Sequence, residues 1–268
     1  MLKRLVRLSI VLAAAVLMLG CEVRPETNSG VLIRIVASDS AAQLVDDLTR
    51  SFSAKRPGVK FDITLHPFPD CQRMVAEGNV HLALAPFSAS EVPVDMELTP
   101  VARDGIAVIV HPSNRVDSLT LLELRDLYFG NIGEWQDLGG AAARVQVLTR
   151  ESECPVARQF EAVVLSGWKV TSAAMVLPNE EAVVDFVSGH SEAIGYVSAA
   201  FADDRVKTVT LEGMQPDPET VAAGVYHIAL DLYALNRTPA APEVTEFLQF
   251  IVSPAGQSVV SRHYGRLR

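Results

Sequence analysis

Three cysteines, Cys21, Cys71 and Cys154, are the side chains of this 268-residue chain that could form a covalent bond or ligate a metal most directly. Their number excludes a disulfide-dense mini-protein, which would depend on many more. The serine-hydrolase, zinc-protease and P-loop motifs (G-x-S-x-G, H-E-x-x-H and G-x-x-x-x-G-K-[ST]) do not occur in the sequence. We therefore expect a protein that is not an enzyme and that needs no cofactor.

Cys21 ends the segment Leu17-Met18-Leu19-Gly20-Cys21, which resembles a bacterial lipobox. Basic residues begin the chain, and the apolar run Leu8–Leu19 that follows them is too short, at about 18 Å of helix, to cross a membrane. These features predict a lipoprotein signal peptide over 1–20, lipidation of Cys21 and a polar tether over 21–30. We expect a lipid-anchored, extracytoplasmic protein of the cell envelope; an uncleaved N-terminal anchor is the alternative.

The elements after the tether alternate between strand and helix. Apolar, β-branched runs predict strands over Val31–Val36, Val59–Leu65, Val80–Ala85 and Gly105–Val110. Between the first three, apolar residues at helical spacing or helix-compatible residues predict helices, and amphipathic helices end the chain over 244–252 and 254–264. This order predicts an α/β protein whose mostly parallel sheets are flanked by helices.

Composition limits the partners. Hydrophobic residues make up 49% of the chain, which excludes a disordered protein. The 32 acidic residues exceed the 23 basic ones and give a net charge of −9, so we expect no nucleic-acid partner.

Several separated blocks resemble the phosphate-binding proteins of ABC transporters, in the order found in that family. They are Val101–Asn114, Leu124-Arg125-Asp126-Leu127-Tyr128-Phe129-Gly130, Arg150-Glu151-Ser152, Ala193-Ile194-Gly195-Tyr196-Val197 and Ser253-Pro254-Ala255-Gly256-Gln257. The resemblance implies a two-lobed type II periplasmic-binding-protein fold with a ligand cleft between the lobes. Lobe 1 would comprise 31–110 plus 213–268, and lobe 2 would comprise 111–212.

The resemblance also implies a ligand and a partner. The family binds phosphate through backbone N–H groups at helix N-termini, hydroxyls, one Arg and one Asp, a chemistry that fits the positive end of the helix dipole. A small-molecule or oxyanion ligand, an ABC permease partner and a monomeric state are therefore expected. The alternative is a binding-protein-like module that takes no part in transport.

The aligned loops of lobe 1 depart from the family pattern. Its Gly-Ser-x-Thr loop is Ala37-Ser38-Asp39-Ser40 here, which keeps two hydroxyls for a ligand or for capping a helix. Its Gly-Ser-Gly-x-Gly loop is replaced by Pro67–Cys71, which loses the glycines and two N–H donors and adds the carboxylate of Asp70. His81 stands at the position of the family's Asp, and the Arg that follows that strand in the family is missing.

In lobe 2 the family's Gly-Ser-Gly-Thr becomes Glu153-Cys154-Pro155-Val156, and its Arg becomes Ala157, with Arg158 one position late. Glu153 would repel an anion at close range. The resemblance thus implies altered or lost phosphate binding. The candidate ligand-binding residues are Ser38, Asp39, Ser40, Asp70, Cys71, His81, Ser152, Glu153, Cys154 and Arg158.

The alignment places Cys71 and Cys154 on opposite sides of the cleft. Because an exported protein can form disulfides, one hypothesis is a Cys71–Cys154 disulfide that holds the lobes closed. Two unrelated buried thiols are one alternative, and a Cys/His metal site that also uses His81, with or without His66, is the other.

Overall fold

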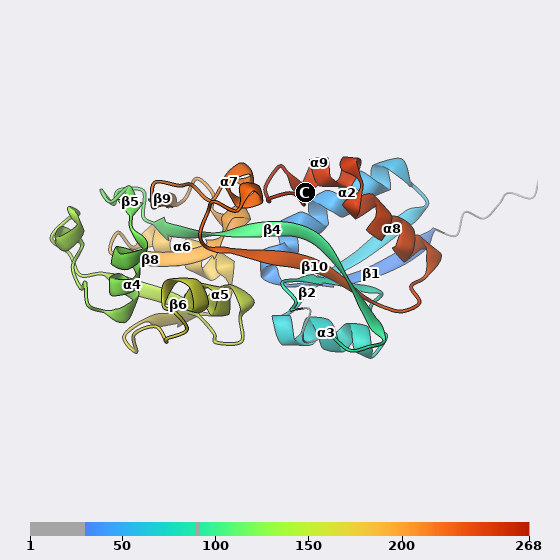
Figure 1. The fold of residues 1–268 in the computed structure, drawn as a ribbon, viewed down its shortest axis with the longest axis horizontal. Coiled ribbons are helices and arrows are strands. Elements are labelled where there is room, and N and C mark those ends of the chain that lie inside the picture. The colour runs from blue at the N-terminus through green and yellow to red at the C-terminus, as the bar shows by residue number, and fades with distance from the viewer. Residues whose placement is uncertain (1–29, 89–91, 268) are drawn as a thin grey trace, which may run out of the picture. The chain divides into compact units, whose positions relative to one another are not determined.

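The computed structural model describes residues 30–88 and 92–267, and two long adjacent strands organise this part of the chain (Figure 1). Strand β4 (Met96–Val110) and strand β10 (Ala229–Arg237) are antiparallel and pair from Met96 with Arg237 to Gly105 with Ala229. The sheet order is β2-β1-β3-β10-β4-β8-β6-β7. The two long strands therefore lie in the middle of the sheet, with one group of parallel strands beside β10 and another beside β4.

The first half of the sheet contains β1 (Val31–Ala37), β2 (Val59–Leu65) and β3 (Leu82–Ala85). Strand β1 lies between β2 and β3 and is parallel to both. Four helices belong to this half, on the side of Figure 1 that carries the C-terminus: α2 (Ala42–Lys55), α3 (Phe68–Ala76), α8 (Pro242–Val252) and α9 (Pro254–Val260).

The second half contains β6 (Gln146–Arg150), β7 (Met175–Leu177) and β8 (Ala193–Ser198), with β6 parallel to both others. A short parallel pair, β5 (Ser118–Leu119) and β9 (Lys207–Leu211), joins β4 through β9. The helices are α4 (Leu121–Phe129), α5 (Pro155–Val164), α6 (Glu180–Gly189) and α7 (Pro218–Ala223), with short 3₁₀ turns at Asp39–Ala41, Trp135–Leu138 and Ala199–Phe201.

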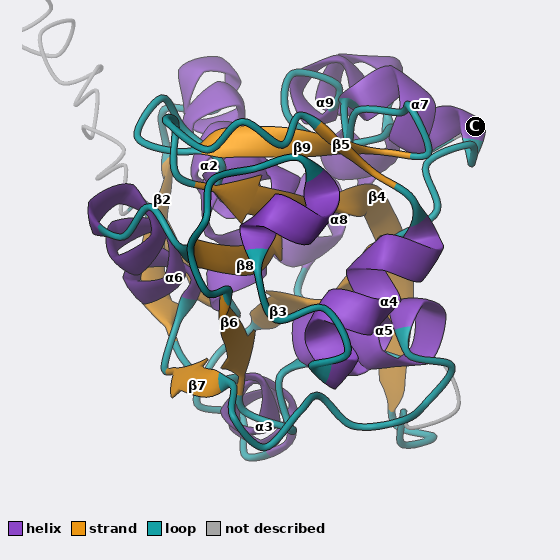
Figure 2. Cartoon of the chain, turned by 90° about the vertical axis from the view of Figure 1, so that its left-hand side faces the viewer, coloured by secondary structure: helices purple, strands orange, loops and turns teal. Residues whose placement is uncertain are grey.

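Side chains of strand β8 point alternately to the two faces of the sheet and so belong to two different hydrophobic clusters. In β8, Ile194 and Tyr196 pack on the side of α4 and α5, whereas Ala193 and Val197 pack against α6. Figure 2 shows α6 and the α4–α5 pair on opposite sides of β6 and β8. Because successive side chains of a strand point to opposite faces, a strand covered on both faces is apolar throughout, as β8 is.

The expected strands and helices are present, with differences at their ends. The strand predicted over Val80–Ala85 begins at Leu82. The strand predicted over Gly105–Val110 begins at Met96, and the helix predicted to reach Tyr264 ends at Val260. The α/β architecture with parallel groups flanked by helices is confirmed, and the antiparallel pairing of β10 and β4 makes the whole sheet mixed.

Some predictions fall on residues for which no structure is described. The signal peptide over 1–20, the lipidated Cys21 and nearly all of the tether over 21–30 lie outside the described residues. Within 30–88 and 92–267 there is no helix with the length and hydropathy needed to span a bilayer. Residues Val31–Arg268 form one compact unit, so the division into two lobes stays a prediction.

Candidate functional site

A cavity of about 440 Å³ lies where loops of the two halves of the sheet meet, and we call it the carboxylate pocket. Loops after β1 and β2 line one side of it, and the loop between β6 and α5, the start of α6 and the 3₁₀ turn at Phe201 line the other. This is the usual location of ligands in open α/β sheets, at the carboxyl ends of the strands. It is lined by Asp39, Leu65, His66, Pro67, Phe68, Pro69, Arg150, Glu151, Glu153, Cys154, Pro155, Pro178, Asn179, Glu180, Glu181 and Phe201.

Arg150, the last residue of β6, supplies the guanidinium of this pocket, and its side chain is only 3% exposed. Its Nη1 lies 3.0 Å from Oδ2 of Asp39, which makes an ion pair between the two halves of the sheet. Its Nη2 donates to Glu151 Oε1 and to the carbonyl of Pro178, both at 3.2 Å. Burial lowers the pKa of Arg150, but the hydrogen bond to Glu151 and the charges around it outweigh burial and raise that pKa. The guanidinium is therefore charged and has carboxylates of the chain beside it, but Nη1 makes no hydrogen bond among the described residues.

Glu180, the first residue of α6, is fully buried at the edge of the same pocket. Its Oε2 accepts the backbone N–H of Ser198 at 3.1 Å, whereas Oε1 has no hydrogen-bond partner among the described residues. Burial raises the pKa of Glu180 well above its usual value, and the nearby charges of Asp39 and Asp104 add to that effect. Burial therefore disfavours the ionised form of this carboxyl group.

Asp104, in β4, is a second fully buried carboxyl group near Glu180. Neither of its oxygens makes a hydrogen bond of good geometry within the described part of the chain, although the Ser198 hydroxyl and two backbone N–H groups are close enough to affect its pKa. Burial raises the pKa of Asp104 to about 8, although the Ser198 hydroxyl and the N–H groups of Ala199 and Gly105 act in the opposite direction. Asp104 does not line the pocket, so its effect there is electrostatic.

Two of the three helices that begin at the pocket, α3 and α5, are poor anion cradles. Helix α3 has Pro67 as its N-cap and Pro69 in its first turn, and α5 begins with Pro155. Proline has no N–H, so each of these residues removes a donor from a helix end that would otherwise attract an anion. The sequence predicts that these loops have lost N–H donors for an anion. The structure places the prolines concerned at the N-termini of α3 and α5.

Aromatic packing occupies the space between these helix ends. The rings of Phe68 and Phe87 lie 5.5 Å apart, and the guanidinium of Arg158 lies 5.4 Å from the centroid of the Phe68 ring. Arg158 belongs to α5 and Phe68 to α3, so this cation–π contact joins the two halves of the sheet. Arg158 faces an aromatic ring and does not line the carboxylate pocket.

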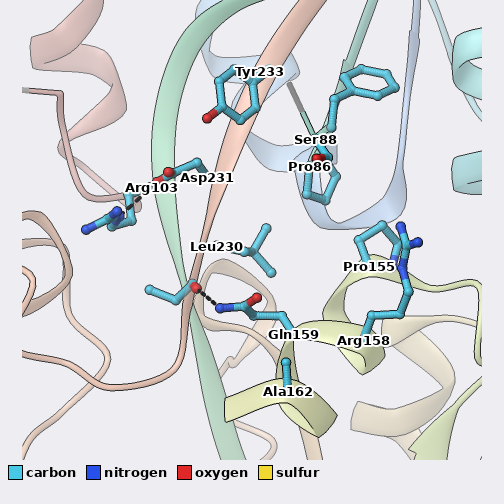
Figure 3. A pocket seen from close by; sticks show the side chains of 12 residues that line it. Pro86, Ser88, Arg103, Pro155, Arg158, Gln159, Ala162, Leu230, Asp231 and Tyr233 are labelled. Atoms are coloured by element: carbon cyan, nitrogen blue, oxygen red, sulfur yellow. Dashed lines mark hydrogen bonds and ion pairs between the residues drawn. The ribbon is translucent and has the colours of Figure 1, made fainter. Parts of the chain in front are cut away.

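A second cavity, of about 570 Å³, lies between α5 and the long strands, and we call it the hinge pocket (Figure 3). Arg103 and Asp231 pair within it at 2.8 Å, and Gln159 donates to the carbonyl of Ala229 at 2.6 Å. Arg158 and Ser88 also line it. Arg103 and Asp231 are each about two-fifths exposed, so their ion pair is of the weak, solvated kind.

The structure brings only some of the predicted ligand residues together. Asp39, Glu153 and Cys154 line the carboxylate pocket. Ser38 and Ser40 are buried with their hydroxyl oxygens 3.1 Å apart and line neither cavity. Asp70 pairs with Arg73 at 2.6 Å and also lies outside both.

Two further predicted residues are elsewhere. Ser152 is exposed and does not cap α5, whose N-cap is Cys154. His81 lies before β3, opposite Arg34 at the other end of the strand, where its Nδ1 accepts the Arg34 N–H at 2.9 Å. Burial and the charge of Arg34 lower the pKa of His81. His81 therefore lies at the N-terminal end of β3, whereas the carboxylate pocket lies at the carboxyl ends of the strands.

The predicted Cys71–Cys154 disulfide is wrong for this structure, since both cysteines are free thiols. Cys71 packs with Val36 and Val75 in the cluster on the α3 face of the sheet, and its Sγ lies 3.7 Å from the Pro67 carbonyl. Cys154 packs in the main core with Phe160. The two thiols thus enter different cores, and the alternative of two separate buried cysteines fits.

The alternative of a Cys/His metal site is not supported either. Among the described residues, no three His, Cys, Asp or Glu side chains are grouped so that they could hold a metal ion. His66 lines the carboxylate pocket, but His81 is remote from it for the reason given above.

Arg150, Glu180 and Asp104 are the functional candidates that the sequence did not single out as ligand residues. Arg150 was visible within a family-like block, at the end of a strand. Glu180 follows Asn179, whose side chain accepts the Ala182 N–H and caps α6, so sequence alone would favour an ordinary acidic first turn. Its burial depends on contacts with β8 that no local pattern encodes.

The comparisons with known proteins agree on one family. A family profile described as a PBP superfamily domain matches residues 24–255. The phosphate-binding protein PstS of Bacillus subtilis is 24% identical over 233 residues, covering 85% of this chain and 77% of the relative. The PstS of Pseudomonas aeruginosa PAO1 is 25% identical over 258 residues, covering 84% and 79%.

Solved structures give the same result. A Clostridium perfringens protein, assigned to the substrate-binding proteins of phosphate ABC transporters and crystallised with bound phosphate, has a TM-score of 0.82. It is 27% identical, and the match covers 88% of this chain and all of that one. An ABC-type phosphate transport receptor from Vibrio cholerae, 24% identical with a TM-score of 0.68 over 88% of this chain and 99% of that one, shares the fold. The resemblance and the type II periplasmic-binding-protein fold expected from the sequence are confirmed.

Proposed function

This chain belongs to the PBP superfamily, and we propose that it is an extracytoplasmic solute-binding lipoprotein that delivers a small molecule to an ABC permease. Cys21 would carry the lipid anchor, and the protein would act as a monomer without enzymatic activity. The cavity between the two halves of the sheet supports this function, because its volume is within the range of small-molecule sites.

We further propose that tight phosphate binding is lost. The main support is the ion pair of Arg150 with Asp39. The guanidinium that lines the pocket lies beside carboxylates of the protein itself, those of Asp39 and Glu151. Glu153 adds a further carboxylate at the N-terminus of α5. A phosphate would meet like charges, each costing on the order of 1–4 kcal/mol at a distance near 4 Å.

Isothermal titration calorimetry of the detergent-solubilised full chain with inorganic phosphate tests the second statement. We expect no saturable heat below millimolar phosphate at pH 7.5. Saturable binding at micromolar phosphate would show that the pocket still recognises this anion.

A thermal-unfolding screen against small metabolites tests the first statement. A true ligand at about 100 times its Kd stabilises a protein by about 2.7 kcal/mol, which corresponds to a Tm rise of about 5–11 °C for a chain of this size. If no metabolite raised Tm, a solute-binding role would lose its support.

A further inference from the structure

The carboxylate pocket has an excess of acidic groups over the one guanidinium that lines it among the described residues. Five carboxyl groups, those of Asp39, Glu151, Glu153, Glu180 and Glu181, line the pocket. Arg150 pairs with the first two of these, and Glu181 pairs with Arg205, which stands outside the lining, at 2.9 Å.

Glu153 and Glu180 have no cationic partner within the described part of the chain. Glu153 is exposed, whereas Glu180 is fully buried, with the unpartnered oxygen Oε1. A buried acceptor without a partner costs about 1–3 kcal/mol, and a donor brought by a ligand would remove this cost. The unpartnered Oε1 of Glu180 therefore points to a ligand that brings a hydrogen-bond donor to this side of the pocket.

The remaining wall of the pocket is apolar. Phe68, Pro155 and Phe201 line it together with further prolines and Leu65. Such a surface suits an alkyl chain, and the two phenyl rings suit a cation as well, because an ammonium ion is attracted to an aromatic face.

We propose, on the basis of the solute-binding function above, that the carboxylate pocket binds a small organic ammonium ion whose N–H group donates to Oε1 of Glu180. The alkyl part of the ligand would pack on the apolar wall, and Glu153 would add long-range attraction. An anion that approached Arg150 would meet the carboxylates of Asp39 and Glu151, which makes a carboxylate ligand the less favourable choice.

Binding should also release a proton. Glu180 faces Asp39 from the first half of the sheet, Asp104 from β4, Arg150 from β6 and Cys154 at the start of α5. Burial and the two aspartates raise its pKa, while Arg150 and the Ser198 N–H lower it, and the net effect is a raised pKa. An ammonium ion favours the ionised form, so the Glu180 proton would leave to the buffer on binding.

The experiment is a calorimetric titration of the full chain in detergent at pH 7.5 with four probes of one chain length: hexylammonium, hexanol, hexanoate and 6-aminohexanoate. We expect hexylammonium to bind at least about tenfold more tightly than the other three. Titration in buffers of different ionisation enthalpy should show net proton release on hexylammonium binding.

Two variants give the contrast. Glu180→Gln keeps an acceptor for the Ser198 N–H and has no ionisable proton, so it should lose the proton release and about tenfold in hexylammonium affinity. Glu97→Gln removes an exposed carboxylate of β4 that does not line the pocket, and it should behave as the unmodified chain does. Matching Tm values for the two variants would establish that both are folded.

Tighter binding of hexanoate, hexanol or 6-aminohexanoate than of hexylammonium would overturn the ammonium assignment while leaving a solute-binding function intact. The assignment would also be overturned if Glu180→Gln bound hexylammonium as the unmodified chain does, or if hexylammonium alone failed to bind. If all four probes and the metabolite screen fail, the proposed function fails as well.

Discussion

The ion pair between Asp39 and Arg150 should contribute measurably to stability, because it is buried on the arginine side and links the two halves of the sheet. At 3.0 Å the bare attraction is about 5 kcal/mol at an effective dielectric of 20 and about 1.4 kcal/mol in water. Asp39 is 29% exposed, and Glu151 still pairs with Arg150 when Asp39 is removed. We therefore expect Asp39→Asn to cost about 1–3 kcal/mol, between the values for exposed and buried pairs.

Urea unfolding followed by circular dichroism measures this loss, and the chain offers a matched control. Asp46 pairs with Arg50 on the surface of α2, where both side chains are more than half exposed. Asp46→Asn should cost no more than about 0.5 kcal/mol. Arg150→Met should cost more than Asp39→Asn, because it leaves Asp39, Glu151 and Glu180 close together without their cation.

The double variant Asp39→Asn/Arg150→Met decides whether the two residues act together. Direct pairing predicts that its cost falls short of the sum of the single costs by about 1–3 kcal/mol. Additive single costs, or equal losses for Asp39→Asn and Asp46→Asn, would refute the assignment of this pair as a contact of energetic weight between the two halves.

Two further outcomes follow from the buried groups. The pKa of Asp104 is raised from 3.8 in the unfolded chain to about 8 in the folded one by burial, so its stabilising contribution is full below pH 4 and is lost as pH rises to 8. We expect the stability of Asp104→Asn relative to the unmodified chain to rise between pH 5 and pH 8, by on the order of 4 kcal/mol, and then to stay constant to pH 9. Urea unfolding at pH 5, 6.5, 8 and 9 measures this difference. A difference that does not change with pH would contradict this reasoning. Burial raises the pKa of Cys71 to about 12 and that of Cys154 to about 11, so both thiols should react with Ellman's reagent slowly in the folded chain and fully in urea without reductant. Failure of these two thiols to react in urea until reductant is added would restore the disulfide.

Sequence patterns were sufficient for the elements that rely on local periodicity. The run Val59–Leu65 alternates between apolar and polar residues and forms β2 with the predicted bounds. Strand β10 and the first half of β4 were not predicted, because their pairing partners lie more than a hundred residues apart in the chain and local patterns do not report such pairing.

The sequence by itself determined the α/β class, the family and the loss of the glycine-rich anion loops, since these depend on residue types in order along the chain. Only the tertiary structure decided which charges meet. It paired Arg150 with Asp39, buried Glu180 beside the pocket, moved His81 to the opposite end of β3 and separated Cys71 from Cys154. The physical reason is that electrostatic and covalent contacts depend on distance and burial in three dimensions, and an alignment specifies neither.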